Sequence, residues 1–163
     1  MNRIILFSFC IFALLTLAAC KKDSPENYYF TMKIDNQQFS FSDTVRAQKT
    51  TSQPALLVEA VSKTQGIFRG LFSASTTGQY INTEDNSAPR IIYQFTINAI
   101  VAYNNNNPVY LQLLRPSPSV NNSISMTISK VTNTYMEGTF SGFLTNGSTL
   151  NTISEGRFKV PFQ

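Results

Sequence analysis

The chain has 163 residues, of which 42% are hydrophobic and 13% are charged, and it contains two Cys, no His and no Trp. Zinc, haem and His-based catalytic sites draw on His or Cys side chains, so this composition argues against such sites and predicts no metal. The formal net charge of +4 is spread along the chain, whereas nucleic-acid-binding proteins usually have a clustered basic face. We therefore expect no nucleic-acid partner.

Residues 1–19 predict a secretory signal peptide. Arg3 supplies a positive charge, and residues 4–19 are apolar except for Ser8 and Thr16. As a helix this stretch would reach about 24 Å, short of the roughly 30 Å hydrocarbon core of a bilayer. A charged start and a short apolar stretch ending in small residues are typical of a cleaved signal peptide. An uncleaved membrane helix is the less favoured alternative.

Leu17, Ala18, Ala19 and Cys20 resemble a bacterial lipobox, which consists of Leu, two small residues and an invariant Cys. The resemblance implies that a diacylglycerol is attached to the Cys20 thiol, that the chain is cut before Cys20, and that the new amino group is acylated. Two or three acyl chains hold a protein stably at a lipid bilayer. We therefore expect the bilayer as a partner through Cys20, and no cofactor apart from the covalent diacylglycerol and N-acyl lipid. An ordinary Cys after a conventional cleavage site is the alternative.

Cleavage before Cys20 would change the composition of the mature protein. Cys10 would leave with the signal peptide and Cys20 would carry lipid, so no disulfide is expected even in an oxidising compartment. Loss of Arg3 would lower the formal net charge from +4 to +3. The fold of the mature protein would then depend on hydrophobic packing and on hydrogen bonds between strands.

Residues 20–27 contain the lipidated Cys and a polar tether without an apolar pattern. Lys22 and Asp23 look like the Lys-plus-acidic segment that follows the lipidated Cys in surface-exported lipoproteins of Bacteroidota. No Asp follows Cys20 directly, so the inner-membrane retention signal known from enterobacteria is absent. We expect an outer-membrane location, with the cell surface favoured over the periplasmic face.

Residues 28–163 predict one β-domain, because their dominant hydrophobic period is two. Apolar and polar residues alternate through residues 28–34, a turn follows at 35–37, and the alternation returns through 38–42, which predicts a hairpin. The same alternation occurs in residues 56–60, 93–103, 123–129 and 157–162. With frequent turn residues and no helical stripe, the pattern predicts an all-β fold: a single antiparallel β-sandwich of roughly 8–10 strands, or alternatively a calycin-like β-barrel.

Residues 29–36 are similar to the opening strand of a family of Bacteroidota lipoproteins of unknown function, which begins with an aromatic strand ending in Ile-Asp-Gly. Asn36 stands where that family has Gly, and Asn also tolerates the left-handed backbone region. Residues 125–129, 136–142 and 155–160 resemble the closing strands of the family, which carry Gly-Thr-Phe and a final Gly-x-Phe. The resemblance implies a secreted β-rich domain, and it supplies no activity, catalytic residue or ligand.

The Asn-rich segment at residues 104–108 is flanked by Tyr103 and Tyr110. Aromatic rings stack on sugars and amides reach sugar hydroxyls, so Tyr103, Asn105 and Tyr110 are candidate ligand contacts. The favoured interpretation is a hairpin turn, for which Asn and Pro suit the backbone.

Two further patterns suggest a modification site and a calcium site, each on a short motif. The sequence Asp43-Thr44-Val45 resembles the acceptor for O-glycosylation in Bacteroidota, which makes Thr44 a candidate modification site. Glu84 and Asp85 offer carboxylates for a calcium loop. A solvated turn is favoured there, because no spaced Asp pattern accompanies the pair.

The leading functional hypothesis is a non-enzymatic binding or interaction module at the cell envelope, with a glycan or an envelope protein as its partner. A structural or assembly component of an envelope protein complex is the alternative. A hydrolase that uses carboxylates alone, with Glu59 and Glu137 as its pair, ranks last, because the sequence does not reveal whether these two residues lie at a catalytic separation.

Overall fold

The computed structural model describes residues 27–50, 55–73, 76–82, 90–110, 114–120 and 123–163. The predicted signal peptide, Cys20 and residues 21–26 of the tether lie outside these residues, as do Glu84 and Asp85.

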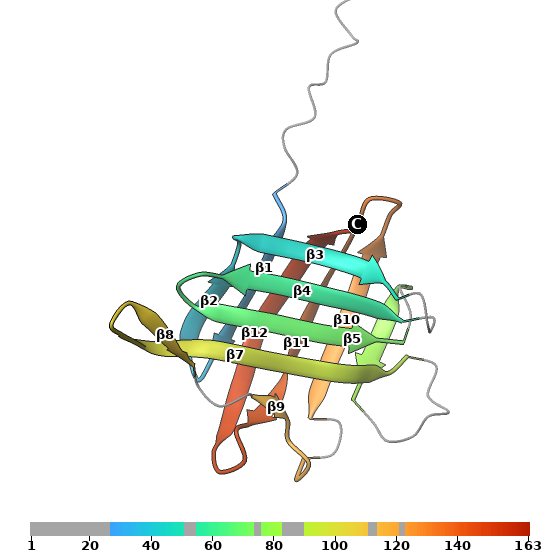
Figure 1. Ribbon diagram of the computed structural model, residues 1–163. Coiled ribbons are helices and arrows are strands. Elements are labelled where there is room, and N and C mark those ends of the chain that lie inside the picture. Colours follow the sequence, from blue (N-terminus) through green and yellow to red (C-terminus); the bar gives the residue numbers. More distant parts are fainter. Residues whose placement is uncertain (1–26, 51–54, 74–75, 83–89, 111–113, 121–122) are drawn as a thin grey trace, which may run out of the picture.

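The described residues form two antiparallel sheets (Figure 1). The seven-stranded sheet has the order β2 (Gln37–Phe41), β1 (Tyr29–Ile34), β12 (Leu150–Pro161), β11 (Tyr135–Thr145), β10 (Ile124–Val131) and β6 (Gly78–Ile81), and β9 (Arg115–Pro116) also pairs with β11. The five-stranded sheet has the order β3 (Thr44–Lys49), β4 (Leu56–Ser62), β5 (Gly66–Phe72), β7 (Ile92–Asn104) and β8 (Asn107–Tyr110).

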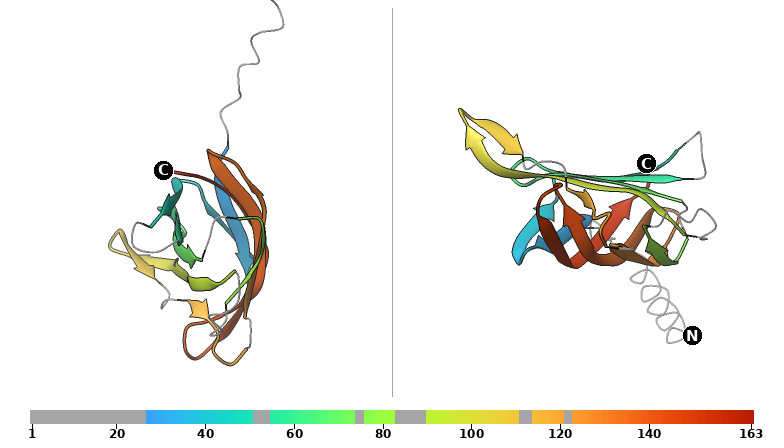
Figure 2. Two further views of the ribbon diagram at one scale, coloured as in Figure 1. Left: turned by 90° about the vertical axis from the view of Figure 1, so that its right-hand side faces the viewer. Right: turned by 90° about the horizontal axis from the view of Figure 1, so that it is seen from below.

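The two sheets pack face to face, and their strands cross at a large angle, as in orthogonally packed sheets (Figures 1 and 2). The predicted all-β sandwich is confirmed, and the barrel alternative is wrong, because the strands form two separate open sheets rather than one closed one. The structure has more strands than expected, since β6, β8 and β9 are only two to four residues long. Such strands are too short to show a period of two.

Paired residues with positive φ close two of the hairpins. Asp35 and Asn36 have φ of 48° and 68° between β1 and β2, and Asn105 and Asn106 have φ of 48° and 65° between β7 and β8. Positive φ at both central residues is what a two-residue hairpin turn of the primed type requires. The hairpin predicted over residues 28–42 is therefore confirmed.

Phenylalanine rings from both sheets form the centre of the core. Phe30 of β1 stacks on Phe68 of β5, with ring centroids 4.1 Å apart, and so joins the seven-stranded sheet to the five-stranded one. Phe140 of β11 lies 5.0 Å from Phe30, and Phe95 of β7 lies 5.4 Å from Phe140. All four side chains are buried. Packed rings thus fill the centre of the core, and aliphatic side chains surround them.

The exposed edge of β2 is covered by the side chain of Gln65, which lies in the turn between β4 and β5. The backbone N–H of Ser40 donates to Oε1 of Gln65, and Nε2 of Gln65 donates to the backbone carbonyl of Gln38 at 3.3 Å. The side-chain amide of Gln65 thereby takes the place that the peptide group of another strand would occupy. This arrangement satisfies part of an edge that could otherwise pair with another chain.

The ring stack predicts a large cost for removing Phe30. We expect Phe30→Ala to lower the free energy of unfolding by about 3–5 kcal/mol, because it leaves a cavity where the two sheets meet. Urea unfolding followed by circular dichroism measures this loss. The control is Leu150→Ala, since Leu150 is 51% exposed and an exposed side chain is expected to change stability by no more than about 0.5 kcal/mol. Equal losses in the two variants would contradict the role of the stack.

Candidate functional site

The Asn-rich segment forms the tip of the β7–β8 hairpin, which projects from the body of the sandwich (Figure 2). Asn105 is exposed there, in the left-handed backbone conformation that the turn requires. Tyr103 and Tyr110 lie in β7 and β8, and their side chains are outside the described part of the chain. The favoured interpretation as a hairpin turn is confirmed, and a ligand contact at Tyr103, Asn105 or Tyr110 stays a prediction.

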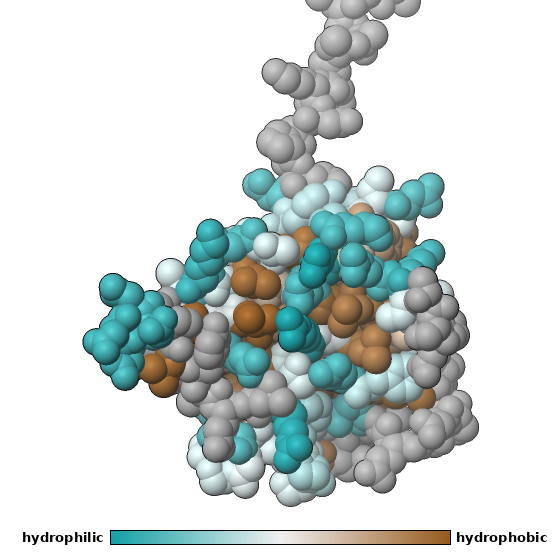
Figure 3. All heavy atoms as spheres, viewed as in Figure 1, coloured by the Kyte–Doolittle hydropathy of each residue, from teal (hydrophilic) through white to brown (hydrophobic). Residues whose placement is uncertain are grey.

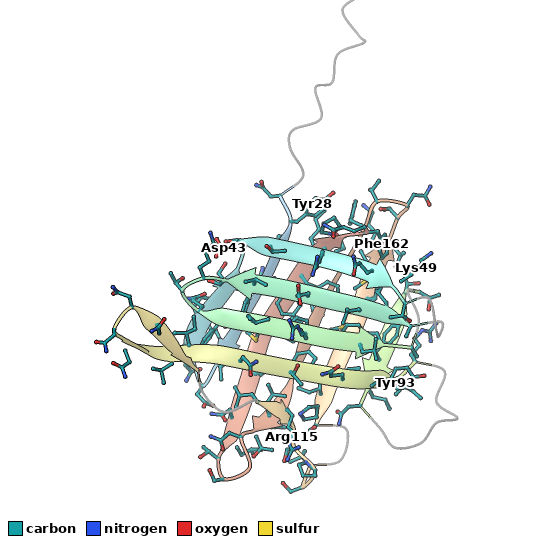
Figure 4. The ribbon with its side chains drawn as sticks, in the orientation of Figure 1. Tyr28, Asp43, Lys49, Tyr93, Arg115 and Phe162 are labelled. Carbon is teal, nitrogen blue, oxygen red and sulfur yellow. The ribbon has the colours of Figure 1, made fainter. Side chains whose placement is uncertain are left out.

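Thr44 is the exposed first residue of β3. Asp43 precedes it at the start of the strand (Figure 4), and Oδ2 of Asp43 accepts a hydrogen bond of 2.6 Å from the backbone N–H of Lys63. The aspartate therefore ties the start of β3 to the β4–β5 turn. Glycosylation of Thr44 stays a prediction.

Glu59 and Glu137 do not form a catalytic pair. Glu59 alternates with the buried Val58 and Ala60 in β4, so it faces outward from the five-stranded sheet. Glu137 lies beside the buried Met136 in β11 and faces outward from the seven-stranded sheet. The two carboxylates are thus on opposite faces of the sandwich, with the core between them.

Glu59 is instead the centre of an ion-pair ladder across three strands. Nη2 of Arg46 in β3 lies 2.7 Å from Oε1 of Glu59, and Nε of Arg69 in β5 lies 2.8 Å from Oε2. The hydrogen bond from Arg69 and that from Arg46 hold the pKa of Glu59 below its ordinary range, although partial burial of the carboxylate opposes them. Both carboxylate oxygens are engaged, so Glu59 acts as a structural link between strands.

Aliphatic side chains lie on the same face, on either side of the ladder. Leu57 of β4 pairs with Leu71 of β5, and Val61 pairs with Ile67, all at outward-facing, partly exposed positions. Figure 3 shows apolar side chains on this face, interrupted by hydrophilic ones. Tyr93, which is 51% exposed, lies towards one end of the sheet (Figure 4). The five-stranded sheet therefore presents a mixed apolar and charged surface.

The outer face of the seven-stranded sheet has a different character, because hydroxyl side chains occupy most of its centre. Strand register places a row of polar residues side by side across six strands: Ser40, Thr31, Arg157, Thr139, Thr127 and Gln79. Adjacent strands lie about 4.8 Å apart, so these side chains are close neighbours. Ser125 and Ser141 pair in the same way on β10 and β11.

These residues surround a depression of about 310 Å³ over β10, β11 and β12. Its side-chain lining consists of Ser125, Thr127, Thr139, Ser141, Glu155 and Arg157. The register between β11 and β12 shifts beside Glu155, whose φ is 52°. A bulge of this kind re-aims a side chain relative to the regular strand. Glu155 and Arg157 are two residues apart and therefore lie on the same face of β12, where both line the depression.

Arg157 differs from Glu155, the other charged residue that lines the depression. Nζ of Lys33 lies 2.6 Å from Oε1 of Glu155, so that carboxylate has a partner. Arg157 is exposed, and no described residue forms a hydrogen bond or an ion pair with its guanidinium. No motif in the sequence singles out Arg157. The alternation in residues 157–162 indicates that it faces outward, and nothing local shows which hydroxyls lie next to it.

Aromatic and basic residues also gather at the end of the sandwich where residue 28 enters the domain. Figure 4 shows Tyr28, Phe162 and Lys49 at this end. Nζ of Lys159 lies 4.3 Å from the ring centroid of Tyr135 and 5.9 Å from that of Tyr28. This end of the sandwich therefore combines aromatic rings and basic groups close to the start of the described residues.

Comparisons with protein-family models, with curated proteins and with solved structures gave no match to this chain. In the described ranges, no three His, Cys, Asp or Glu side chains are grouped so that they could hold a metal ion. A search of the same ranges for a helix of sufficient length and hydropathy to cross a membrane found none.

The lowered pKa of Glu59 predicts a pH-dependent contribution to stability. Because the folded-state pKa lies below the unfolded one, the contribution is present above about pH 4.3, the ordinary pKa of Glu, and is lost as the pH falls through the folded-state value. We expect Glu59→Gln to cost about 1 kcal/mol at pH 7, and the difference from the unmodified protein to shrink at lower pH. Urea titrations between pH 7 and pH 3 measure this difference. Glu137→Gln, on the opposite face, serves as the control, and a difference for Glu59→Gln that grows towards pH 3 would contradict the assignment.

Proposed function

We propose that this protein is an outer-membrane lipoprotein whose β-sandwich is a non-enzymatic binding module for a glycan at the cell envelope. The observation that carries the binding part is the depression lined by hydroxyls on the seven-stranded sheet. The lipobox-like residues 17–20 carry the anchoring part.

The lining of the depression suits a sugar better than an apolar ligand. Ser and Thr hydroxyls both donate and accept hydrogen bonds, as sugar hydroxyls do. The volume of about 310 Å³ lies at the lower end of the usual range for small-ligand pockets. The rings of Phe140 and Phe158 face the core and are buried. Recognition would therefore rest on hydrogen bonds to the Ser and Thr side chains rather than on ring stacking.

The tether supports a ligand close to the membrane. Residues 21–27 separate Cys20 from the domain, and seven extended residues reach at most about 25 Å. Of the two possible locations, the cell surface is favoured over the periplasmic face. A domain anchored there by a short tether lies among the polysaccharides of the cell surface. The lipid bilayer is then a partner through the diacylglycerol and N-acyl chains on Cys20.

The surface on the five-stranded sheet favours a second candidate function, a structural or assembly component of an envelope protein complex. The partly exposed pairs Leu57–Leu71 and Val61–Ile67 offer apolar area. The ladder around Glu59 has its charges paired within the chain. A protein partner would suit this surface better than a sugar.

The anchor predicts a simple outcome for Cys20→Ala in cells. We expect loss of the acyl-chain label and release of the protein from the membrane fraction, because the thiol that accepts the lipid is gone. Metabolic labelling with an alkyne fatty acid and membrane fractionation measure both effects. Cys10→Ala is the matched control and should keep the label. A Cys20→Ala protein that stays labelled and membrane-bound would show that the lipobox interpretation is wrong.

The binding module predicts a positive response on a panel of polysaccharides with the full-length lipoprotein in detergent. Thr139→Val should weaken that binding about two- to tenfold, the cost of one lost hydrogen bond. The control is Thr96→Val, because Thr96 lies on the five-stranded sheet. A flat panel together with a protein crosslinked through the surface around Leu57 and Val61 would favour the assembly function instead.

A further inference from the structure

Arg157 occupies the middle of the polar row on the seven-stranded sheet. Thr31 lies beside it on β1, Thr139 lies beside it on β11, and Thr127 follows on β10. Its guanidinium is thus placed between hydroxyls, at the border of a depression that a ligand can enter.

The three ion pairs that the structure describes do not include Arg157. Arg46 and Arg69 are both engaged by Glu59, and Lys33 is engaged by Glu155. The guanidinium of Arg157 has no such partner among the residues that the structure describes. Arginine presents a planar fork of donors that matches a carboxylate in a bidentate manner. The site therefore has an anion-binding group that no described residue engages, with a hydroxyl residue on each side of it.

The charge balance around the depression selects the kind of anion. Arg157 and Lys33 each contribute one positive charge, and Glu155 contributes one negative charge, so the formal sum is +1. One carboxylate per sugar unit neutralises this sum. A phosphate group carries up to two negative charges at pH 7, and among the described residues Arg157 is the one cation that lines the depression. A neutral sugar would leave the donors of Arg157 without an acceptor.

From this arrangement we propose that the ligand is a carboxylated glycan of the uronic acid class, whose carboxylate is bound by Arg157. This proposal rests on the proposed glycan-binding function and specifies its ligand. The hydroxyls of Thr139, Thr127 and Ser141 contact the sugar hydroxyls. Glu155 accepts hydrogen bonds from the sugar and repels a carboxylate, so the acidic group is oriented towards Arg157.

The test measures binding of oligogalacturonate to the full-length lipoprotein in detergent by isothermal titration calorimetry. The native protein should bind the free acid at least tenfold more tightly than its methyl ester, because esterification removes the charge and keeps the sugar. Arg157→Gln should lose at least tenfold in affinity for the acid, the effect expected for a hydrogen bond to a charged group. Arg157→Lys should be intermediate, since it keeps the charge and loses the fork. Binding of the acid should also weaken as the salt concentration rises.

The matched control is Arg115→Gln, which removes an exposed arginine from β9, and it should bind the acid as the native protein does. Equal affinity for the acid and its methyl ester, or an unchanged affinity in Arg157→Gln, would overturn the proposal. Tighter binding of a phosphorylated oligosaccharide than of the acid would overturn the choice of carboxylate. Binding of neutral glycans alone would refute the uronic acid ligand and leave the proposed function standing. Failure of the native protein to bind any glycan would contradict both.

Discussion

The stacking of Phe30 on Phe68 is the contact on which the rest of the structure depends, because it joins β1 of one sheet to β5 of the other at the centre of the core. Rings and aliphatic side chains fill the space between the sheets, and successive side chains of a regular strand point to opposite faces, so the intervening side chains are directed to an outer face. Surfaces for recognition therefore lie on the two outer faces and in the loops. This constraint also explains why Glu59 and Glu137, both outward, cannot meet across the core.

The two outer faces differ in how their charged and polar side chains are paired. On the five-stranded sheet, Glu59 satisfies two arginines within the chain, and aliphatic pairs flank the ladder. On the seven-stranded sheet, short hydroxyl side chains leave a depression, and the exposed Arg157 lines it. A surface whose charges are already paired gains little electrostatically from a ligand, whereas an unpaired guanidinium gains a charge-assisted hydrogen bond. This difference is the physical reason for preferring the seven-stranded sheet as the binding face.

Local patterns in the sequence were sufficient for much of the fold. The alternation in residues 28–34 and 123–129 identified β1 and β10, and the Asn-rich segment was correctly interpreted as a turn, because Asn tolerates the left-handed conformation that Asn105 and Asn106 adopt. The short strands β6, β8 and β9 were not predicted from the sequence, because a segment of two to four residues is too short to show a hydrophobic period of two. The candidate pair Glu59 and Glu137 failed for a related reason, since sequence spacing carries no information on which sheet a strand joins.

The period of two in the sequence indicated which residues of longer strands such as β1 and β10 face the core, and the sequence also contains the lipobox-like pattern that predicts an anchor. Only the tertiary structure decided which outward residues became neighbours. Thr31 lies next to Arg157, and Arg157 next to Thr139, because β12 returns from the end of the chain to pair with both β1 and β11. A period of two assigns a residue to a face, whereas strand pairing over more than a hundred residues is set by the packing of the whole core. The proposed binding face thus depends on long-range register, which no local pattern encodes.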